Sequence, residues 1–449
     1  MQDDTRPLSP TLPPGLAGYS DYFQPLALGN RRTAMPTGTV LELAIDDRAR
    51  QAVTAETPLK LHLDWSVDDA QQLFAVAQED GLFYPVGRSG LNPQEMTIEW
   101  LPEVDEALVA TPLAERRNVQ RVLKLYLYRM VGWQEETLGL HRVRYIEPTE
   151  VDWIDLTPGE FLREFDGGAL VYSPVDATAI LPRQRVAIAV HGFSADSKTL
   201  ASWLTTIHPQ HFQAYDHVLA YDYESLATGI NENARRLADA LRALELHVRP
   251  RLRVDLFAHS MGTMISRAMV ELWGGDAFVE RCFLAGPPNQ GTRLADGKKL
   301  VPWLAALALN GVGAWTPAAI AGWALEKLEG DAVGVEDLRP GSQFLQDLNQ
   351  TDKPVSARYF ILAGNNPLLP QQDEKILQLL KRRVLQGVDL ALDTIFGDQN
   401  DLVINVESML GIRDGNYPKA LLKTAEVPCN HFSYFHSAES QAQLLEWLR

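Results

Sequence analysis

Three polar residues that lie far apart in the sequence have the types and the order of a hydrolytic site. Ser260 stands between Ala258 and Gly262 in the pentapeptide Ala-His-Ser-Met-Gly. Asp401 follows in a segment rich in Asn and Asp, and His431 comes near the end of the chain. A serine hydroxyl becomes a nucleophile when an imidazole takes its proton and a carboxylate orients that imidazole. The order of nucleophile, acid and base therefore predicts acyl transfer through a covalent serine intermediate.

The residues on both sides of Ser260 predict a sharp turn between a strand and a helix. Ala258 and Gly262 are small, which lets the two elements pass closely at a strained bend. The first N–H groups of the helix, beginning with that of Met261, point toward the serine and favour a negative charge there. Upstream, another predicted strand runs into His-Gly-Phe, where the N–H of Phe193 is expected to be a second donor. These two N–H groups are the predicted oxyanion hole.

Each of these roles has a rival in the sequence. Ser260 by itself could be an ordinary turn serine, and Cys429 is a weaker nucleophile candidate because no elbow surrounds it. Asp398 competes with Asp401, and either aspartate could instead cap a turn. His436 competes with His431 but is better placed to begin the C-terminal helix. Asp401 and His431 are preferred because an apolar Leu-Val-Ile run follows the first and a predicted strand precedes the second.

The remaining histidines and cysteines do not indicate a metal or a cofactor. His191 and His259 flank the predicted oxyanion turn and the elbow, where a histidine is more often a hydrogen-bonding support than a catalytic group. Cys282 and Cys429 have no zinc-site spacing. They are expected at opposite ends of a sheet, too far apart for a disulfide. We therefore expect no metal and no cofactor.

The elements around these residues predict an α/β fold. Apolar runs typical of parallel strands covered on both faces alternate with helical stretches such as 230–244. The predicted strands are 186–190, 217–221, 253–258, 281–285, 358–363 and 420–426. Strands and helices in this rhythm predict a mostly parallel sheet with helices on both faces.

This part of the chain resembles the α/β-hydrolase superfamily, and within it the lipase-like branch that includes bacterial lipases and GPI inositol-deacylases. The resemblance covers about residues 170–449. It rests on phrases that keep their order, namely His191-Gly-Phe, the Ser260 elbow, Leu284-Ala-Gly-Pro-Pro-Asn-Gln-Gly-Thr, Arg339-Pro-Gly-Ser-Gln-Phe-Leu-Gln-Asp-Leu-Asn, Asn400-Asp-Leu-Val-Ile and Asn430-His-Phe. It implies an esterase or lipase whose triad is Ser260, Asp401 and His431. Ala258 replaces the more usual glycine, and Asn405 stands where relatives often have proline.

Four regions are predicted along the chain. They are a Pro- and Gly-rich tail (1–36), a small β-sandwich-like domain (37–146) with Trp65, Trp100 and Trp133 as core aromatics, a linker (147–170) and the α/β-hydrolase domain (171–449). A helical cap insertion is expected at about 293–350. Its candidate substrate contacts are Trp303, Leu307, Trp315 and Trp323, although plain packing against the sheet is expected for most of this segment. A second insertion, 371–393, predicts an amphipathic helix with a solvated basic face.

Composition and charge limit the class of protein. Of 449 residues, 46% are hydrophobic, so the chain can bury a core. Lys+Arg 41 against Asp+Glu 58 gives a net charge of −17, which argues against nucleic acid as a partner. The first residues are acidic and rich in proline rather than basic and apolar, and no transmembrane span is predicted. We therefore expect a cytoplasmic location.

The leading interpretation is a serine hydrolase that cleaves carboxylic esters, including lipid-like acyl esters. The same residues would serve an amidase, a thioesterase or an acyltransferase. An alternative from another class is a non-catalytic binding or scaffold protein, for example an effector module whose β domain docks a protein partner.

Overall fold

A computed structural model of the chain describes two compact units. The larger unit contains Gln134–Leu300, Gly330–Pro370 and Val388–Arg449, and the smaller one contains the remaining residues. The residues that the structure describes are 137–147, 149–150, 155–165, 168–193, 196–207, 215–225, 228–298, 303, 333–365 and 399–449, together with residues 53, 58 and 101 and the strands of the smaller unit given below.

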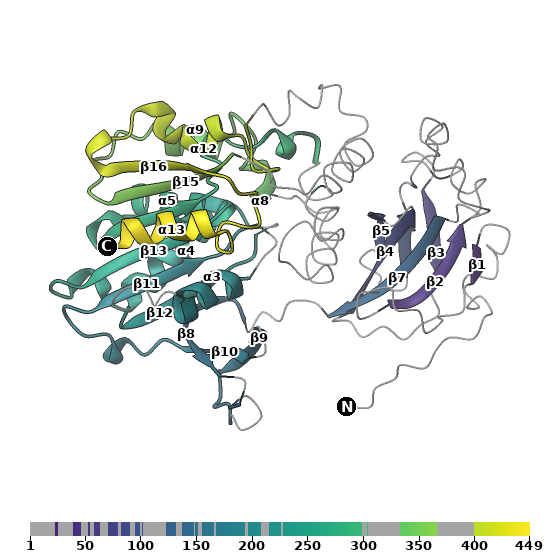
Figure 1. Ribbon diagram of the computed structural model, residues 1–449, viewed down its shortest axis with the longest axis horizontal. Helices are drawn as coiled ribbons and strands as arrows, with labels where there is room; N and C mark the ends of the chain where they lie inside the picture. Colours follow the sequence, from purple (N-terminus) through teal and green to yellow (C-terminus); the bar gives the residue numbers. More distant parts are fainter. Residues whose placement is uncertain are drawn as a thin grey trace. The chain divides into compact units, whose positions relative to one another are not determined.

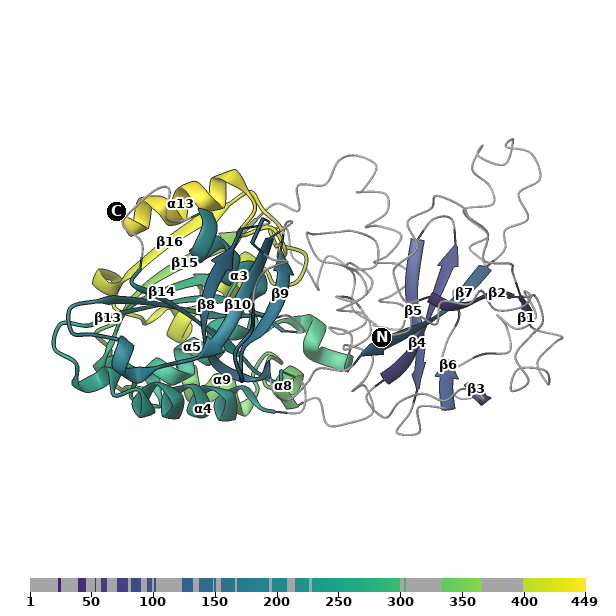
Figure 2. The same cartoon turned by 90° about the horizontal axis from the view of Figure 1, so that it is seen from below.

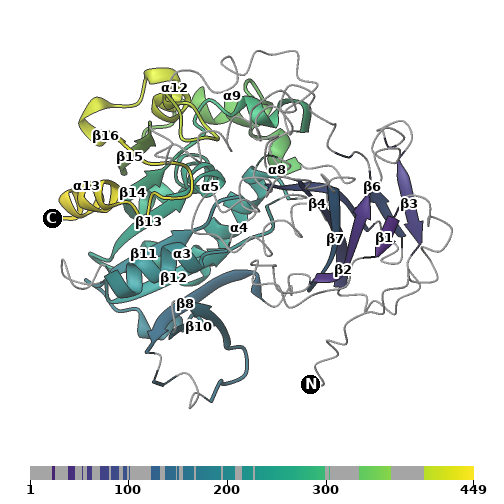
Figure 3. The same ribbon diagram turned by 45° about the vertical axis from the view of Figure 1, so that its right-hand side comes forward.

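A nine-stranded sheet forms the framework of the larger unit, in the order β16-β15-β14-β13-β11-β12-β8-β10-β9. Neighbouring strands are parallel from β16 to β12, whereas β8, β10 and β9 extend the sheet as antiparallel strands. The strands are β8 (Gly139–Ile146), β9 (Phe161–Phe165), β10 (Gly168–Pro174), β11 (Arg185–Val190), β12 (His217–Asp222), β13 (Arg253–His259), β14 (Val279–Ala285), β15 (Arg358–Gly364) and β16 (Leu422–Val427). β8 and β10 lie side by side near one end of the sheet (Figures 1 and 3).

Helices cover both faces of this sheet. α3 and α13 lie on one face and α4 and α5 on the other (Figure 2). The α-helices are α3 (Lys198–Ser202), α4 (Ile230–Ala243), α5 (Met261–Glu271), α8 (Val333–Glu336), α9 (Gln343–Asn349), α12 (Val406–Leu410) and α13 (Ala438–Leu448). The 3-10 helices are η5 (Ala177–Ala179), η8 (Leu246–Val248), η9 (Gly275–Ala277), η10 (Arg293–Lys298), η11 (Ile412–Gly415) and η12 (Lys419–Leu421), and η6 (Trp203–Ile207) is a π-helix. This is the α/β-hydrolase architecture that the sequence predicts. Within the described residues, none of the helices has the length and apolar character needed to cross a bilayer.

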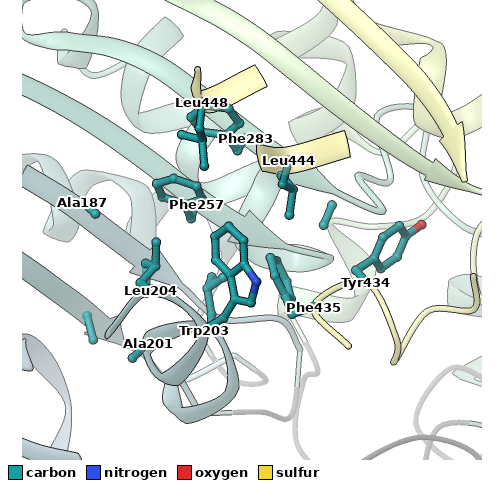
Figure 4. Packing of buried hydrophobic residues seen from close by; sticks show 14 of the residues in the cluster. Ala187, Ala201, Trp203, Leu204, Phe257, Phe283, Tyr434, Phe435, Leu444 and Leu448 are labelled. Atoms are coloured by element: carbon teal, nitrogen blue, oxygen red, sulfur yellow. The ribbon is translucent and has the colours of Figure 1, made fainter. Parts of the chain in front are cut away.

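An aromatic core lies between the sheet and the helices α3 and α13 (Figure 4). Phe257, Phe283 and Phe360 come from three adjacent strands and stack face to face, with 4.7 and 4.8 Å between successive ring centroids. Trp203 and Phe435 pack against each other beside Phe257. Each such side chain contributes about 1.5–3 kcal/mol by burial. The core therefore holds the strands whose ends carry the predicted site.

The smaller unit contains a seven-stranded antiparallel sheet in the order β1-β2-β7-β4-β5-β6-β3 (Figure 1). Its strands are β1 (Phe23–Pro25), β2 (Thr39–Ile45), β3 (Leu59–His62), β4 (Gln71–Glu79), β5 (Leu82–Ser89), β6 (Glu95–Ile98) and β7 (Leu123–Val131). The predicted N-terminal β region is thus an antiparallel sheet, and its sandwich form stays a prediction.

Strand pairing corrects three of the predicted boundaries. β1 lies within the predicted tail but pairs with β2. β8 lies within the predicted β domain but pairs with β10 and β12 of the larger sheet. β9 and the start of β10 lie within the predicted linker but are sheet strands. An alternating run reveals that a strand has one buried face and does not reveal its partner, so sequence periodicity assigned these segments to the wrong region.

Candidate active site

Ser260 occupies a strained turn between β13 and α5. Its φ of 51° and ψ of −124° lie outside the regions that L-residues normally adopt. A Cβ at Gly262 would lie 2.1 Å from the carbonyl oxygen of His191 and 2.6 Å from that of Val190. Only glycine therefore lets α5 cross the end of β11 so closely. The predicted need for small residues is confirmed here, and Ala258 is fully buried.

A chain of hydrogen bonds links Ser260, His431 and Asp401. The Oγ of Ser260 lies 2.9 Å from Nε2 of His431, and Nδ1 of His431 lies 2.7 Å from Oδ2 of Asp401. His431 is 3% exposed and Asp401 is fully buried. Because a carboxylate only accepts hydrogen bonds, the neutral imidazole carries its proton on Nδ1 and turns the lone pair of Nε2 toward the hydroxyl. This is the polarity needed to remove a proton from Ser260.

Backbone N–H groups hold the carboxylate of Asp401. Its Oδ1 accepts hydrogen bonds from the N–H of Val403 at 3.1 Å and of Ile404 at 2.8 Å. Leu402, which lies between Asp401 and Val403, has a φ of 82°, which bends the loop back on itself. The carbonyl oxygen of Asp401 also accepts from the N–H of His431 at 2.7 Å, so the loops that carry Asp401 and His431 are tied together. These bonds offset the cost of burying the charge.

Tyr434 is a further donor to this carboxylate. Its hydroxyl donates to Oδ2 of Asp401 at 2.9 Å and accepts from the N–H of Gly364 at 2.8 Å. Figure 4 shows the ring at the edge of the aromatic core with the hydroxyl pointing away from it. Burial, and then the charge of Asp401, raises the pKa of Tyr434 well above its ordinary value, so the hydroxyl keeps its proton. One carboxylate oxygen thus accepts from both Tyr434 and His431.

The two predicted oxyanion donors lie in segments that border Ser260. Met261 is the first residue of α5, and the first N–H groups of a helix have no acceptor within it. Phe193 is buried in the turn after β11, next to Gly192. A Cβ at Gly192 would lie 3.1 Å from the Cβ of Ser260, so this turn packs directly on the elbow. The N–H of Ser260 itself donates to the carbonyl oxygen of Ala285 at 3.0 Å.

His191 and His259 make the supporting contacts that the sequence predicts. Nε2 of His191 accepts from the N–H of Tyr223 at 3.1 Å, so Nδ1 carries the proton and donates to the carbonyl oxygen of Gly192 at 2.7 Å. Nε2 of His259 donates to the carbonyl oxygen of His431 at 2.8 Å. Burial lowers the pKa of both imidazoles, and the nearby His431 lowers that of His259 further. Both rings are therefore neutral at pH 7.

A family model matches residues 163–449, from within β9 to the end of the chain. It is described as a domain of unknown function, DUF7379. The chain belongs to the DUF7379 family. The DUF7379 match contains all three members of the hydrogen-bonded chain described above. No curated protein matches the sequence.

Solved lipase structures are similar to this DUF7379 protein at low identity. The mature form of the Bacillus licheniformis lipase BlEst2 is 18% identical, with a TM-score of 0.38, over 59% of this chain and 91% of that chain. The Staphylococcus hyicus lipase is 16% identical, with a TM-score of 0.34, over 59% of this chain and 93% of that chain. Phospholipase PlaB from Legionella pneumophila is 17% identical, with a TM-score of 0.36, over 50% of this chain and 45% of that chain. The GPI inositol-deacylase-like branch stays a prediction.

The geometry of the DUF7379 domain bears on the rival residues. His436 is exposed, and the hydrogen bond to Ser260 comes from His431. Asp398 lies outside the described residues. Cys429 is buried and unpaired, and burial raises its pKa to about 12, so its sulfur is a thiol at pH 7. Cys282 is likewise buried and unpaired.

Of the predicted cap, the structure describes η10, Trp303, α8 and α9. Trp303 is fully buried, whereas Leu307, Trp315 and Trp323 lie outside the described residues, as do the second insertion and Trp65, Trp100 and Trp133. Asn405 caps α12 by accepting from the N–H of Ser408 at 3.0 Å. In the parts of the DUF7379 domain that the structure describes, no group of three or more His, Cys, Asp or Glu side chains is placed to hold a metal ion.

Sequence reasoning missed several residues that bond to the site or to the segments around it. The sequence gives a weak indication of Tyr434, because this residue follows His431 by three positions. The sequence gives no signal for Arg163, Asp222 or Tyr223, because strand pairing rather than a motif brings these residues near the turn that contains Phe193.

Proposed function

We propose that this protein is a serine hydrolase that cleaves carboxylic esters, including lipid-like acyl esters. The observation that carries the proposal is the contact of the Ser260 hydroxyl with an imidazole whose other nitrogen faces a buried carboxylate, at 2.9 and 2.7 Å. The three residues come from loops that follow β13, β15 and β16, neighbours or near neighbours in the parallel sheet. Their convergence gives a hydroxyl the base that it needs to act as a nucleophile.

In the proposed reaction, Ser260 Oγ attacks the ester carbonyl while Nε2 of His431 takes its proton. Asp401 orients the imidazole and stabilises its charged form. The N–H groups of Met261 and Phe193 hold the developing oxyanion, and one such donor is worth about 3 kcal/mol. His431 then protonates the leaving alcohol. The same imidazole activates the water that releases the acid from the acyl-enzyme.

Labelling with a fluorophosphonate tests the nucleophile. We expect the wild-type protein to label at Ser260 and Ser260→Ala to lose the label. Ester turnover should fall at least about a thousandfold in that variant. Ser266→Ala is the matched control, because Ser266 is a buried serine on α5 whose hydroxyl has no hydrogen-bond partner among the described residues. The control should label and turn over like the wild type.

A panel of p-nitrophenyl esters from acetate to palmitate, with matching amides and thioesters, defines the substrate class. Higher activity toward long acyl chains supports a lipid-like substrate, and higher activity toward amides or thioesters replaces the ester proposal. Equal labelling of wild type and Ser260→Ala, or a folded wild type with no turnover on the whole panel, contradicts catalysis and favours the binding or scaffold alternative.

A further inference from the structure

The end of β12 lies beside the turn that carries Phe193. β11 and β12 are parallel, and Val190 pairs with Tyr221 as the last pair of the ladder. Asp222 and Tyr223 therefore follow on one strand where His191 and Gly192 follow on the other. Side chains just beyond these two strand ends are close enough to bond across them.

Tyr223 holds the first part of the turn. Its hydroxyl donates to the carbonyl oxygen of His191 at 2.8 Å, and its N–H donates to Nε2 of the same residue at 3.1 Å. The two rings stack with centroids 4.1 Å apart and an angle of 9° between their planes. The His191 imidazole in turn donates to the carbonyl oxygen of Gly192, the peptide group that contains the N–H of Phe193. That peptide plane is thus held through its oxygen.

Asp222 holds the residues that follow the turn. Its carboxylate accepts from the N–H of Ser197 at 2.8 Å and from the hydroxyl of Ser197 at 3.0 Å. Arg163 on β9 donates to the same carboxylate at 2.9 Å. The side chain of Asp222 is fully buried and that of Arg163 is 13% exposed. The guanidinium neutralises the charge of the Asp222 carboxylate, so that this carboxylate does not repel an oxyanion nearby.

We infer that Tyr223 and Asp222 are positioning residues that fix the turn on both sides of Phe193, so that its N–H stays aimed at the oxyanion. This inference rests on the proposed ester hydrolysis. Oxyanion donors accelerate a reaction because they are already oriented when the charge develops. Loosening the turn therefore weakens binding of the transition state more than binding of the substrate.

Asp222→Asn is the first test, because it keeps the size of the side chain and removes the charge and one acceptor oxygen. We expect kcat for p-nitrophenyl butyrate to fall about 10- to 100-fold, with KM changed by less than about threefold. Binding of a trifluoromethyl ketone, whose serine adduct carries an oxyanion, should weaken by the same factor as kcat/KM. A purely structural role does not predict that proportionality.

Asp255→Asn is the matched control. Asp255 is 1% exposed, pairs with Arg281 at 2.6 Å and accepts from the hydroxyl of Tyr215 at 2.6 Å. It lies near the start of β13 rather than at the end next to Ser260. This variant also loses a buried Asp–Arg pair, and we expect its kcat to stay within about twofold of wild type for each folded molecule.

Tyr223→Phe is a milder variant that removes only the bond to the His191 carbonyl oxygen, and it keeps the test valid if Asp222→Asn does not fold. We expect a loss in kcat of about 3- to 10-fold with KM unchanged. A rise in KM alone, or equal losses in Asp222→Asn and Asp255→Asn, overturns the inference while leaving ester hydrolysis intact. A wild-type protein without turnover that depends on Ser260 overturns both.

Discussion

The carboxylate of Asp401 is held by four hydrogen bonds, two from backbone N–H groups and one each from His431 and Tyr434. Its two oxygens therefore differ in role. Oδ1 anchors the loop through the two backbone N–H groups. Oδ2 faces the imidazole and also accepts a hydrogen bond from the Tyr434 hydroxyl, which disperses part of its negative charge. The tyrosine thus affects how strongly the carboxylate stabilises a protonated His431.

Replacing Tyr434 with phenylalanine should change the pH dependence of the reaction. Without the hydroxyl, more negative charge on Oδ2 faces Nδ1 of His431 and favours the protonated imidazole. In the proposed reaction, His431 must be neutral to act as the base. The acid limb of the kcat/KM profile should therefore move to higher pH. Initial rates between pH 4.5 and 9 measure this shift.

Tyr359→Phe is the control for that experiment. Tyr359 is equally buried, and its hydroxyl donates to Oε1 of Glu271 at 3.1 Å, outside the hydrogen-bonded chain of Ser260, His431 and Asp401. Its acid limb should coincide with that of the wild type. An acid limb that is unchanged or moves to lower pH in Tyr434→Phe would show that the tyrosine does not influence the base.

At the scale of elements, the close crossing of α5 over the end of β11 positions Ser260. The backbone of β11 leaves no room for a Cβ at Gly262, since two carbonyl oxygens would lie within 2.6 Å of it. Backbone atoms of a central strand cannot move as easily as a side-chain tip. This contact between Gly262 and the backbone of β11 holds the strained turn at Ser260 in place.

Gly262→Ala should therefore push α5 away from β11. We expect a loss of at least about 2 kcal/mol in the free energy of unfolding, together with slower labelling of Ser260 by a fluorophosphonate. Urea denaturation and labelling rates measure the two effects. Ala258→Gly provides the comparison, because it creates no clash and should cost only about 0.5–1 kcal/mol. A Gly262→Ala protein as stable as Ala258→Gly would contradict the packing argument.

At the scale of the whole molecule, burial of neutral histidines makes stability depend on pH. Burial is the main cause that lowers the pKa of His141 and His191, which are 8% and 2% exposed. In the part of the chain that the structure describes, the buried Nδ1 of His141 has no hydrogen-bond partner, and its ring packs edge-on against Phe161. In the unfolded chain both imidazoles titrate near the ordinary histidine pKa of about 6.5.

The larger unit should lose stability as the pH falls below about 6.5. Above that pH both imidazoles are neutral in the folded and the unfolded chain. Below it, the unfolded chain binds protons that the folded chain does not, and unfolding becomes easier by about 1.4 kcal/mol per pH unit for each such histidine. The loss ends once the pH reaches the lowered pKa of the folded state. Hydrogen exchange of peptides from β11 and β13 between pH 7.5 and 5.5, corrected for intrinsic rates, measures it.

His141→Phe isolates one of these groups, because phenylalanine keeps an aromatic ring at that position and cannot titrate. The slope of stability against pH should become shallower by about one proton. An unchanged slope would show that His141 does not titrate on unfolding, and stability that rises as the pH falls would contradict the argument for both histidines.

The parallel strands, α4 and α13 could be predicted from the sequence alone, because their apolar periodicity directly reflects which faces are buried. The order of Ser260, Asp401 and His431 could be proposed for a related reason. The small residues on both sides of Ser260, for example, meet the steric need of a sharp turn, and this need involves only a short segment of the chain.

Only the tertiary structure decided which strands pair and which distant groups meet. β8, β9 and β10 belong to the larger sheet through hydrogen bonds to partners that their own sequence does not specify. The contacts of Tyr434 with Asp401, and of Asp222 with Ser197, join residues that are 33 and 25 positions apart. Such contacts depend on the path of the whole backbone, and no local pattern encodes them.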